Sequence, residues 1–308
     1  MSKTCEQVKK IVSDNDIKGK LEFNFNLSKM SWFGVAGNAE IFFVPNSSSD
    51  LALLLKLLPL DINRTVIGMG SNLLIRDGGI DGVTIKLGKN FNNINVESNY
   101  LNVGASVLDK VLSKFCLERS ITGFEFLSGI PGCIGGAVAM NAGCYGSEIK
   151  DIFLSARCLD YQGNEVNIDL SEDFFSYRNN TKVKDLIILE IKFSKVLGNK
   201  NKISNKMNEI NKDRIDAQPR KVRTAGSTFK NPIAQSSKKA WELIELSGSK
   251  TMERNNVTLS DKHANFIVNK QFESANDIET FGELIKSKVF DETGVLLEWE
   301  IKILGTHE

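Results

Sequence analysis

The sequence predicts an α+β protein of two or three domains, and three observations lead to this prediction. At 308 residues the chain is long for a single hydrophobic core. Short apolar runs typical of strands alternate along it with segments whose apolar residues recur at helical spacing. A polar, basic stretch at 195–205 has the composition of a solvated linker. We therefore expect a domain boundary in this stretch.

The part of the chain before the linker is expected to hold three helices and most of the strands. Helices are predicted at 8–17, at 51–58 with a cap at Ser49 and Asp50, and at 107–118 with a cap at Ser106. Strands are predicted at 41–44, 64–67, 73–75, 82–87, 100–103 and 186–193, and a hairpin at 153–160 and 165–168. The later part is expected to alternate between the two types, with helices at 203–215, 239–246 and 275–290 and strands at 257–259, 265–268 and 296–304.

Composition excludes several classes of protein. The formal net charge of +1 does not favour a nucleic-acid partner, and no apolar run is long enough to span a membrane. The five cysteines have no C-x-x-C spacing, and with only two histidines in the chain we expect no metal site. The N-terminus is polar and lacks the apolar core of a signal peptide. We expect reduced thiols and a cytoplasmic location.

The stretch 128–146 has an unusual composition for either a linker or a core helix. It contains six glycines and no charged side chain. Each glycine in a helix costs about 1 kcal/mol relative to alanine, so a helix is not expected here. Glycine instead allows a backbone to approach a flat or anionic ligand closely. A bound nucleotide cofactor is the hypothesis that follows.

A second glycine-rich turn, at 66–79, lies upstream between predicted strands. Gly68, Gly70, Ser71 and Asn72 offer donors that suit a pyrophosphate. The turn lacks the Rossmann fingerprint, because a strand follows it instead of a helix, and it lacks the Lys-Ser/Thr of a P-loop. A pair of tight hairpin turns is the alternative interpretation of the two segments.

Three further segments place polar residues in apolar surroundings. They are Phe174–Arg178, Ala225–Pro232 and Leu296–Ile303. An arginine can grip a carboxylate with two parallel hydrogen bonds. Strand alternation in the last segment would put Glu298 and Glu300 on one face, beside apolar neighbours that can alter their proton affinity. A surface salt bridge, a turn and a solvated face are the respective alternatives.

These motifs, in this order, resemble the UDP-N-acetylenolpyruvoylglucosamine reductases, the flavoenzymes of cell-wall precursor synthesis usually called MurB. The resemblance spans nearly the whole chain. It is carried by Gly68–Leu74, Gly129–Ala137, Asn141–Gly146, Tyr177–Arg178, Gln218–Pro219, Gly226–Pro232, Lys262–Asn269 and Leu297–Glu298.

The resemblance implies a two-part FAD-binding domain of the vanillyl-alcohol-oxidase (PCMH) type, followed by an α+β substrate-binding domain. The expected division is a helical segment at 1–20, the FAD domain at 21–195 with parts at about 21–95 and 96–195, and the substrate domain at 196–308. FAD would be bound without a covalent link, NADPH would be the hydride-donating co-substrate, and the enzyme would be a monomer. The catalytic residues of the family correspond here to Arg178, Ser227 and Glu298.

The resemblance also implies two sets of binding residues. Contacts to the cofactor are expected from Gly68, Gly70, Ser71, Asn72, Leu73, Gly129, Ile130, Pro131, Gly132, Gly135, Gly136, Ala137, Asn141 and Gly143. Contacts to the substrate, UDP-N-acetylenolpyruvoylglucosamine, are expected from Tyr177, Arg214, Gly226, Lys230, Asn231 and His263.

Two features distinguish this chain within the family. The stretch between Arg178 and Gln218 is short, as in the type of enzyme that lacks a tyrosine lid over the substrate. Gly34, Ala36 and Asn38 stand where the family usually has a basic residue, a glycine and a proline, and these departures concern the outer contacts of the flavin.

The chemistry of the family suggests a role for each catalytic residue. Hydride addition to an enol ether conjugated with a carboxylate leaves an enolate-like dianion, which Arg178 and a protonated Glu298 would stabilise. Ser227 would then protonate carbon. Two alternatives stay open: an FAD oxidase of the same superfamily that uses oxygen, and a module that binds flavin without catalysis. A covalent flavin link through Cys133 or Cys144 is a minor variant.

Overall fold

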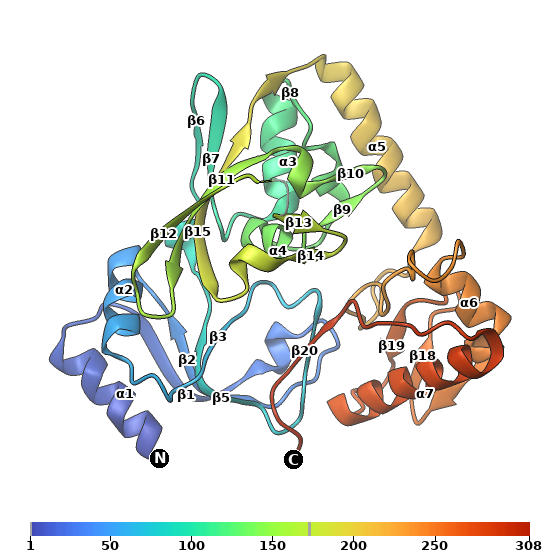
Figure 1. Cartoon of the computed structure of the whole chain (residues 1–308), viewed down its shortest axis with the longest axis horizontal. Coiled ribbons are helices and arrows are strands. Elements are labelled where there is room, and N and C mark those ends of the chain that lie inside the picture. Colours follow the sequence, from blue (N-terminus) through green and yellow to red (C-terminus); the bar gives the residue numbers. More distant parts are fainter. Residues whose placement is uncertain (1, 172–173) are drawn as a thin grey trace. The chain divides into compact units, whose positions relative to one another are not determined.

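The structure is a computed structural model that describes residues 2–171 and 174–308 (Figure 1). The chain forms two compact units that interleave along the sequence. The first unit comprises Met1–Phe23, Ile41–Met69 and Gly82–Arg214, and the second comprises Asn24–Glu40, Gly70–Asp81 and Ile215–Glu308. The domain limits expected from the resemblance, with a boundary at 195/196, stay a prediction.

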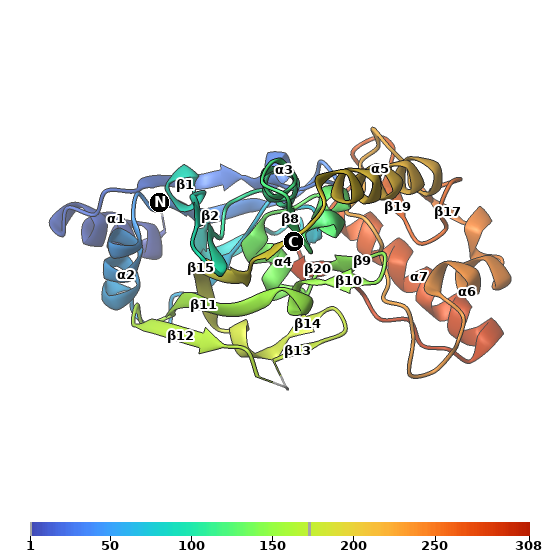
Figure 2. The ribbon, with the colours of Figure 1, turned by 90° about the horizontal axis from the view of Figure 1, so that it is seen from above.

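An antiparallel sheet of five strands forms the centre of the first unit (Figures 1 and 2). Its order is β12 (Glu165–Asp169), β11 (Phe153–Asp160), β15 (Leu186–Ser194), β7 (Tyr100–Gly104) and β6 (Ile94–Val96). Helix α4 (Ile134–Ala139) contacts β7 and β15. Helix α3 (Asp109–Glu118) contacts the 3-10 helix at Glu125–Gly129 and strand β8 (Ile121–Thr122). Apolar side chains of these elements form one core cluster.

A four-stranded sheet has the order β1 (Lys20–Asn26), β2 (Asn38–Val44), β5 (Ile80–Ile85) and β3 (Arg64–Val66), and β3 and β5 are parallel. Helices α1 (Lys3–Asp14) and α2 (Ser48–Leu57) contact each other, and their apolar residues share a cluster with β2 and β5. The same cluster includes Leu159 of β11 and Ile187 and Leu189 of β15, so the two sheets share this core.

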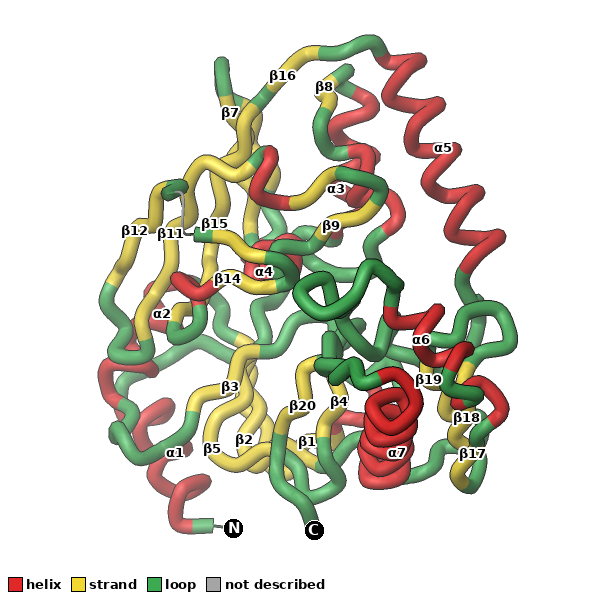
Figure 3. The backbone as a smooth tube through the Cα atoms, turned by 45° about the vertical axis from the view of Figure 1, so that its right-hand side comes forward, coloured by secondary structure: helices red, strands yellow, loops and turns green. Residues whose placement is uncertain are grey.

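The second unit is built on helix α7 (Ala275–Thr293). This helix contacts α6 (Ala240–Leu246) and the three-stranded sheet of β17 (Glu253–Arg254), β18 (Val257–Leu259) and β19 (Ile267–Asn269). It also contacts β4 (Leu73–Ile75), which pairs in parallel with β20 (Lys302–Leu304), and Figure 3 shows this strand pair beside the helix. Residues far apart in the sequence thus share one core.

Smaller elements complete the chain. Helix α5 spans Lys200–Ala217, and further 3-10 helices lie at Leu27–Met30, Lys89–Phe91, Ile149–Asp151, Thr181–Val183 and Ser249–Thr251. Two-stranded pairs join β8 with β16 (Val196–Leu197), β9 (Gly143–Cys144) with β10 (Ser147–Glu148), and β13 (Phe175–Ser176) with β14 (Asn179–Asn180).

Most predicted elements are present, and the differences have local causes. Ser47, and not Ser49, caps α2, because its hydroxyl accepts the N–H of Asp50 at 3.0 Å. Ser106 does not cap α3, since its hydroxyl donates to the carbonyl of Gly88 at 2.7 Å and the helix begins at Asp109. Helix α1 begins at Lys3, five residues before the predicted start.

Three predictions about regular structure were wrong. Helix α5 begins at Lys200, so the second half of the predicted linker is helical. The final strand, predicted at 296–304, is confined to β20. In the part of this range before β20, strand-like pairing is limited to the isolated bridge of Trp299 with Phe229. The glycine-rich stretch does contain a helix, α4, in which Gly135 donates its N–H to the carbonyl of Ala105 at 2.8 Å.

Candidate functional site

The predicted site residues are divided between the two units. The first unit holds Gly68, Gly129, Ile130, Pro131, Gly132, Gly135, Gly136, Ala137, Asn141, Gly143, Tyr177, Arg178 and Arg214. The second holds Gly70, Ser71, Asn72, Leu73, Gly226, Ser227, Lys230, Asn231, His263 and Glu298. Each group is therefore considered within its own unit.

Close packing of the chain on itself accounts for part of the glycine-rich segment. A Cβ atom on Gly129 would lie 2.7 Å from Cδ of Arg214, and one on Gly135 would lie 3.0 Å from Cβ of Ala105. Gly136 is different, because the nearest atom to its Cβ position is Sγ of Cys133 at 3.8 Å. Packing within the protein thus favours glycine at 129 and 135, whereas Gly136 leaves room beside the backbone.

The two glycine-rich segments meet in the first unit. A Cβ atom on Gly68 would lie 3.0 Å from Sγ of Cys133. The half-buried Lys86, which sequence reasoning missed, donates from Nζ to the carbonyl of Gly68 at 2.8 Å. Burial lowers the pKa of Lys86. A small-residue backbone beside an ammonium group fits the pyrophosphate of a dinucleotide such as FAD.

The rest of the first turn is fixed within the second unit. Gly70 has φ +68°, and a Cβ atom there would lie 1.6 Å from the carbonyl oxygen of Met30. The side chain of Asn72 donates to the carbonyl of Glu300 at 3.1 Å, and the carbonyl of Asn72 accepts from the N–H of Lys302 at 3.0 Å. Asn72 therefore helps to align β4 with β20, and its contact with a cofactor stays a prediction.

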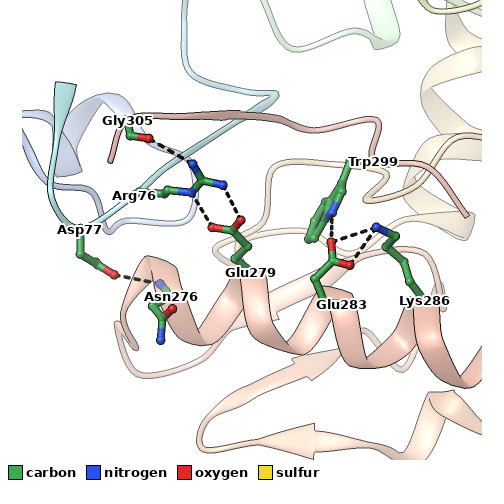
Figure 4. Close-up of polar contacts among 8 residues, drawn as sticks. All are labelled: Arg76, Asp77, Asn276, Glu279, Glu283, Lys286, Trp299 and Gly305. Atoms are coloured by element: carbon green, nitrogen blue, oxygen red, sulfur yellow. Dashed lines mark hydrogen bonds and ion pairs between the residues drawn. The ribbon is translucent and has the colours of Figure 1, made fainter. Parts of the chain in front are cut away.

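The segment after this turn is anchored on helix α7 (Figure 4). Arg76 pairs with Glu279 through Nε at 2.8 Å and Nη2 at 2.7 Å, and its Nη1 donates to the carbonyl of Gly305 at 3.2 Å. Asp77 accepts the N–H groups of Ala275 and Asn276, in the first turn of the helix, at 2.9 and 2.8 Å. Within the second unit, these contacts hold the end of β4 against α7.

Arg178 lies at the tip of a hairpin that is tied to the glycine-rich segment. Tyr177 and Arg178 connect β13 to β14, and Arg178 has φ +55°, an uncommon conformation for a bulky residue. The buried side chain of Asn141 donates to the carbonyl of Ser176 at 3.2 Å. Asn180 donates to the carbonyl of Val138 in α4 at 3.2 Å. The backbone at Arg178 is thus positioned by the same segment that is predicted to bind the flavin.

A second arginine lies against this segment. Arg214, in the last turn of α5, contacts Gly129, and burial lowers its pKa. Burial raises the pKa of the Cys144 thiol, and the charges of Arg214 and Arg178 act against this rise. Guanidinium groups suit an anionic substrate group such as a carboxylate or a phosphate.

In the second unit, the segment that carries Ser227 pairs with the segment that carries Glu298. Phe229 and Trp299 form an antiparallel bridge. The N–H of Lys230 donates to the carbonyl of Glu298 at 2.9 Å, and its Nζ lies 3.2 Å from the carboxylate. The segments that carry Ser227 and Glu298, two predicted catalytic residues, therefore lie side by side.

Asn265 fixes the Ser227 segment and was not among the predicted site residues. Its carbonyl accepts the N–H of Thr228 at 2.8 Å, and its side chain accepts from and donates to the backbone of Phe229 at 2.9 and 2.8 Å. Asn265 is buried. Asn265 lies within the Lys262–Asn269 motif, so the resemblance to the family contained a signal that could have identified it.

Glu298 is exposed, with 67% of its side-chain surface accessible, and its carboxylate faces an ammonium group. Leu297 is buried and both Trp299 and Glu300 are partly buried, so of the two glutamates only Glu298 is exposed, and the segment is not a continuous strand. Protonation of Glu298 stays a prediction about the enzyme with substrate bound.

The remaining substrate candidates of the second unit are held in distinct ways. Burial lowers the pKa of His263, and its Nδ1 accepts the N–H of Asn265 at 3.2 Å. The side chain of Asn231 accepts the N–H of Ala240, the first residue of α6, at 3.0 Å. Gly226 has φ +86° with no atom within 4 Å of its Cβ position, so its conformation alone favours glycine.

The departures from the family pattern begin with Gly34, which accommodates a stacked arginine. Gly34 has φ +76°, and its Cβ position lies 2.9 Å from Cδ of Arg223, whose guanidinium stacks 3.4 Å from the ring centroid of Phe272. A basic side chain therefore lies against the position where a basic residue is missing. Asn38 donates from its side chain to that of Asn24 at 2.8 Å.

Asp109 is a further group that sequence reasoning missed. It is fully buried at the start of α3, and neither carboxyl oxygen has a hydrogen-bond partner among the described residues. Burial raises its pKa well above the usual value. Its N–H donates to the carbonyl of Gly132, so it adjoins the glycine-rich segment. An acidic residue in the first turn of a helix is ordinary, and no sequence pattern distinguishes this one.

The cysteines of the described chain are free thiols. Burial raises the pKa of both Cys116 and Cys158 to about 12 and also raises the pKa of Cys133 and Cys144, which disfavours the reactive thiolate. Across residues 2–171 and 174–308 we find no group of His, Cys, Asp or Glu that could hold a metal ion. Within the same residues, no helix combines the length and apolar character needed to cross a membrane.

Comparisons with known proteins match both parts of the chain. Residues 39–169 match the model of an FAD-binding domain, and residues 218–304 match the model of the UDP-N-acetylenolpyruvoylglucosamine reductase C-terminal domain. Reductases of this name from Rickettsia typhi and Rickettsia akari are 48% and 47% identical to the chain, over 94% of this chain and 98% of theirs.

A solved structure agrees with these matches. The crystal structure of the reductase from Thermus caldophilus is similar with a TM-score of 0.79 and 27% identity, over 94% of this chain and all of that one. The predicted fold class, an FAD-binding domain of the PCMH type with a C-terminal α+β domain, is thereby confirmed. The chain belongs to the family of UDP-N-acetylenolpyruvoylglucosamine reductases and is an FAD-dependent oxidoreductase.

Proposed function

We propose that the protein uses NADPH and FAD to reduce UDP-N-acetylenolpyruvoylglucosamine to UDP-N-acetylmuramate, a step in the synthesis of peptidoglycan precursors. The observation that carries this proposal is the 48% identity to a reductase of this name over nearly the full length of both chains. Arg178, Ser227 and Glu298, the residues that the resemblance makes catalytic, are all present.

FAD, when bound, would accept hydride from NADPH and deliver it to the enolpyruvyl double bond. In the first unit, Lys86, Gly68 and the backbone around Gly136 would hold its phosphates, since they combine positive charge with space beside the main chain. As the resemblance implies, NADPH and the sugar nucleotide would use one binding site in turn, and the sequence, which has no second nucleotide fingerprint, agrees with this order. This order predicts ping-pong kinetics.

Arg178 and Arg214 would bind the anionic groups of the substrate. Hydride addition to the terminal carbon moves negative charge into the carboxylate, so a cation placed there stabilises the transition state more than the ground state. The loss of one such donor typically costs about 10²- to 10³-fold in rate. Arg214 packs against Gly129 and the hairpin of Arg178 is tied to Asn141, so both arginines adjoin the glycine-rich segment, which supports this role.

Ser227 would donate the proton that completes the reduction. The enolate formed by hydride addition is a strong base, so a correctly placed hydroxyl is a sufficient acid, and water can then restore the proton to the serine oxygen. Lys230 beside Glu298 adds positive charge to the same segment. Glu298 would bind a proton as the substrate displaces its ion pair with Lys230 and would then donate a hydrogen bond to the dianion.

A spectroscopic experiment separates this proposal from its alternatives. The purified protein is expected to be yellow and to release its flavin in acid, to bleach with NADPH without oxygen, and to recover its colour when the UDP-enolpyruvyl sugar is added. Recovery with oxygen alone, accompanied by peroxide, would indicate an oxidase. A protein that NADPH cannot bleach would indicate a flavin module without this activity. The free thiols agree with a reducing cytoplasm as the site of action.

A further inference from the structure

We propose that Trp299 is a positioning residue that keeps Glu298 and the Ser227 segment in register by docking on helix α7 at Gly282 and Glu283. The inference rests on the proposed function, because it concerns side chains assigned to that reaction. Trp299 directly follows Glu298 and forms the bridge with Phe229. Its ring centroid lies 5.2 Å from that of Phe229.

The indole is held on α7 by a polar contact with Glu283, which Figure 4 shows, and by a steric contact with Gly282. Its Nε1 donates to Oε1 of Glu283 at 2.6 Å, and Lys286 holds the same carboxylate at 2.8 and 2.9 Å. A Cβ atom on Gly282 would lie 2.1 Å from Cη2 of Trp299 and 2.4 Å from Cζ2. Glycine inside a helix is costly, and here its missing side chain makes room for the ring.

The placement of Glu298 depends on this anchor because its own side chain is largely exposed. Its carbonyl accepts the N–H of Lys230, and the N–H of Glu300 donates to the carbonyl of Thr228 at 2.8 Å. Trp299 lies between these two bonds and packs against the core to which its neighbours Leu297 and Ile301 belong. Movement of the ring would therefore shift both main-chain bonds, and with them the two segments that carry Ser227 and Glu298.

The test compares the full-length, FAD-loaded variants Gly282→Ala and Trp299→Phe with their double mutant. Reduction by NADPH and reoxidation by the UDP-enolpyruvyl sugar are measured separately by anaerobic stopped flow. Because a misplacement of about 1 Å can cost about 10²-fold, we expect Gly282→Ala to slow reoxidation about 10²-fold and Trp299→Phe about 10-fold. Reduction is expected to stay within about twofold of the wild type, since only the second half-reaction uses these groups.

The double mutant provides a readout that a general loss of stability would not produce. Phenylalanine lacks the outer indole atoms that an alanine at 282 would meet, so the double mutant is expected to be no slower than Trp299→Phe alone. Ser287→Ala, at an exposed position of the same helix, is the control and should leave both half-reactions unchanged.

The outcomes separate this inference from the proposed function. If the sugar does not reoxidise the reduced wild-type enzyme, the proposed function is wrong and the inference fails with it. If the sugar reoxidises the wild type and Glu298→Gln slows that step, but Gly282→Ala and Trp299→Phe react at the wild-type rate, only the inference is overturned. If the variants slow reduction by NADPH and reoxidation by the sugar equally, the contact of Trp299 with α7 has only a structural role, and the inference is also overturned.

Discussion

The buried carboxyl group of Asp109 should make the stability of the protein depend on pH in an unusual direction. Asp109 is fully buried, and burial raises its folded-state pKa well above the unfolded value of about 3.9. Above that lower value the unfolded chain has lost the proton, whereas the folded protein still binds it. Folding then takes up one proton, so this group costs stability as pH rises from about 4 to the folded pKa.

The size of the effect follows from this difference of one proton. The free energy of unfolding should fall by about 1.4 kcal/mol per pH unit across that window because of Asp109 alone. Asp109→Asn removes the titration and keeps the size of the side chain. We therefore expect this variant to gain stability over the wild type as pH rises from about 5 to the folded pKa of Asp109, by about 1.4 kcal/mol per unit.

Urea unfolding of the FAD-saturated protein at pH 5, 6, 7 and 8, at one flavin concentration, measures this difference. Asp81→Asn, at an exposed aspartate, serves as the control and should give a curve parallel to the wild type. Parallel pH profiles for the wild type and Asp109→Asn would refute the reasoning, since they would mean that Asp109 titrates alike in the folded and unfolded states.

Three further predictions concern single side chains. Ser227→Ala should leave reduction by NADPH nearly intact and slow reoxidation by the sugar about 10²-fold or more in stopped flow, and normal turnover would refute the assignment. Lys86→Met should raise the FAD dissociation constant about 10- to 10²-fold in fluorescence titrations, because a charge-assisted contact is worth about 1.5 to 3 kcal/mol, and an unchanged constant would exclude this contact. Asn265→Ala should lower the free energy of unfolding by about 2 to 4 kcal/mol in urea, since it leaves the backbone N–H and carbonyl of Phe229 buried without partners, and a change under 1 kcal/mol would contradict the role of Asn265.

Elements with local signals could be predicted from the sequence. The hairpin of β11 and β12 has alternating strands around a turn at Tyr161–Asn164, and α7 has Ser274 as its cap and apolar residues at helical spacing. Long-range pairing left no comparable signal. The strand predicted at 296–304 shrank to β20, because its partner β4 lies more than two hundred residues away and pairs over three residues.

The site residues could be predicted only where a motif carried them. Arg178, Ser227 and Glu298 came from the resemblance, whereas Lys86 and Asp109 lie outside the quoted motifs and gain their importance from burial. The glycine-rich segment illustrates the same limit. Its composition indicated an unusually close approach of the backbone, but only the structure shows that Gly129 accommodates Arg214 and Gly135 accommodates Ala105.

Analysis of the reaction product is the most direct test of the central claim, that this chain reduces the enolpyruvyl group of a UDP-sugar. Purified enzyme, NADPH and UDP-N-acetylenolpyruvoylglucosamine are incubated without oxygen, and the sugar nucleotide is examined by mass spectrometry and NMR. We predict one product that has gained two hydrogen atoms and lost its vinyl signals, with one NADPH consumed per molecule formed. Recovery of unchanged substrate while added oxygen consumes the NADPH would contradict the claim.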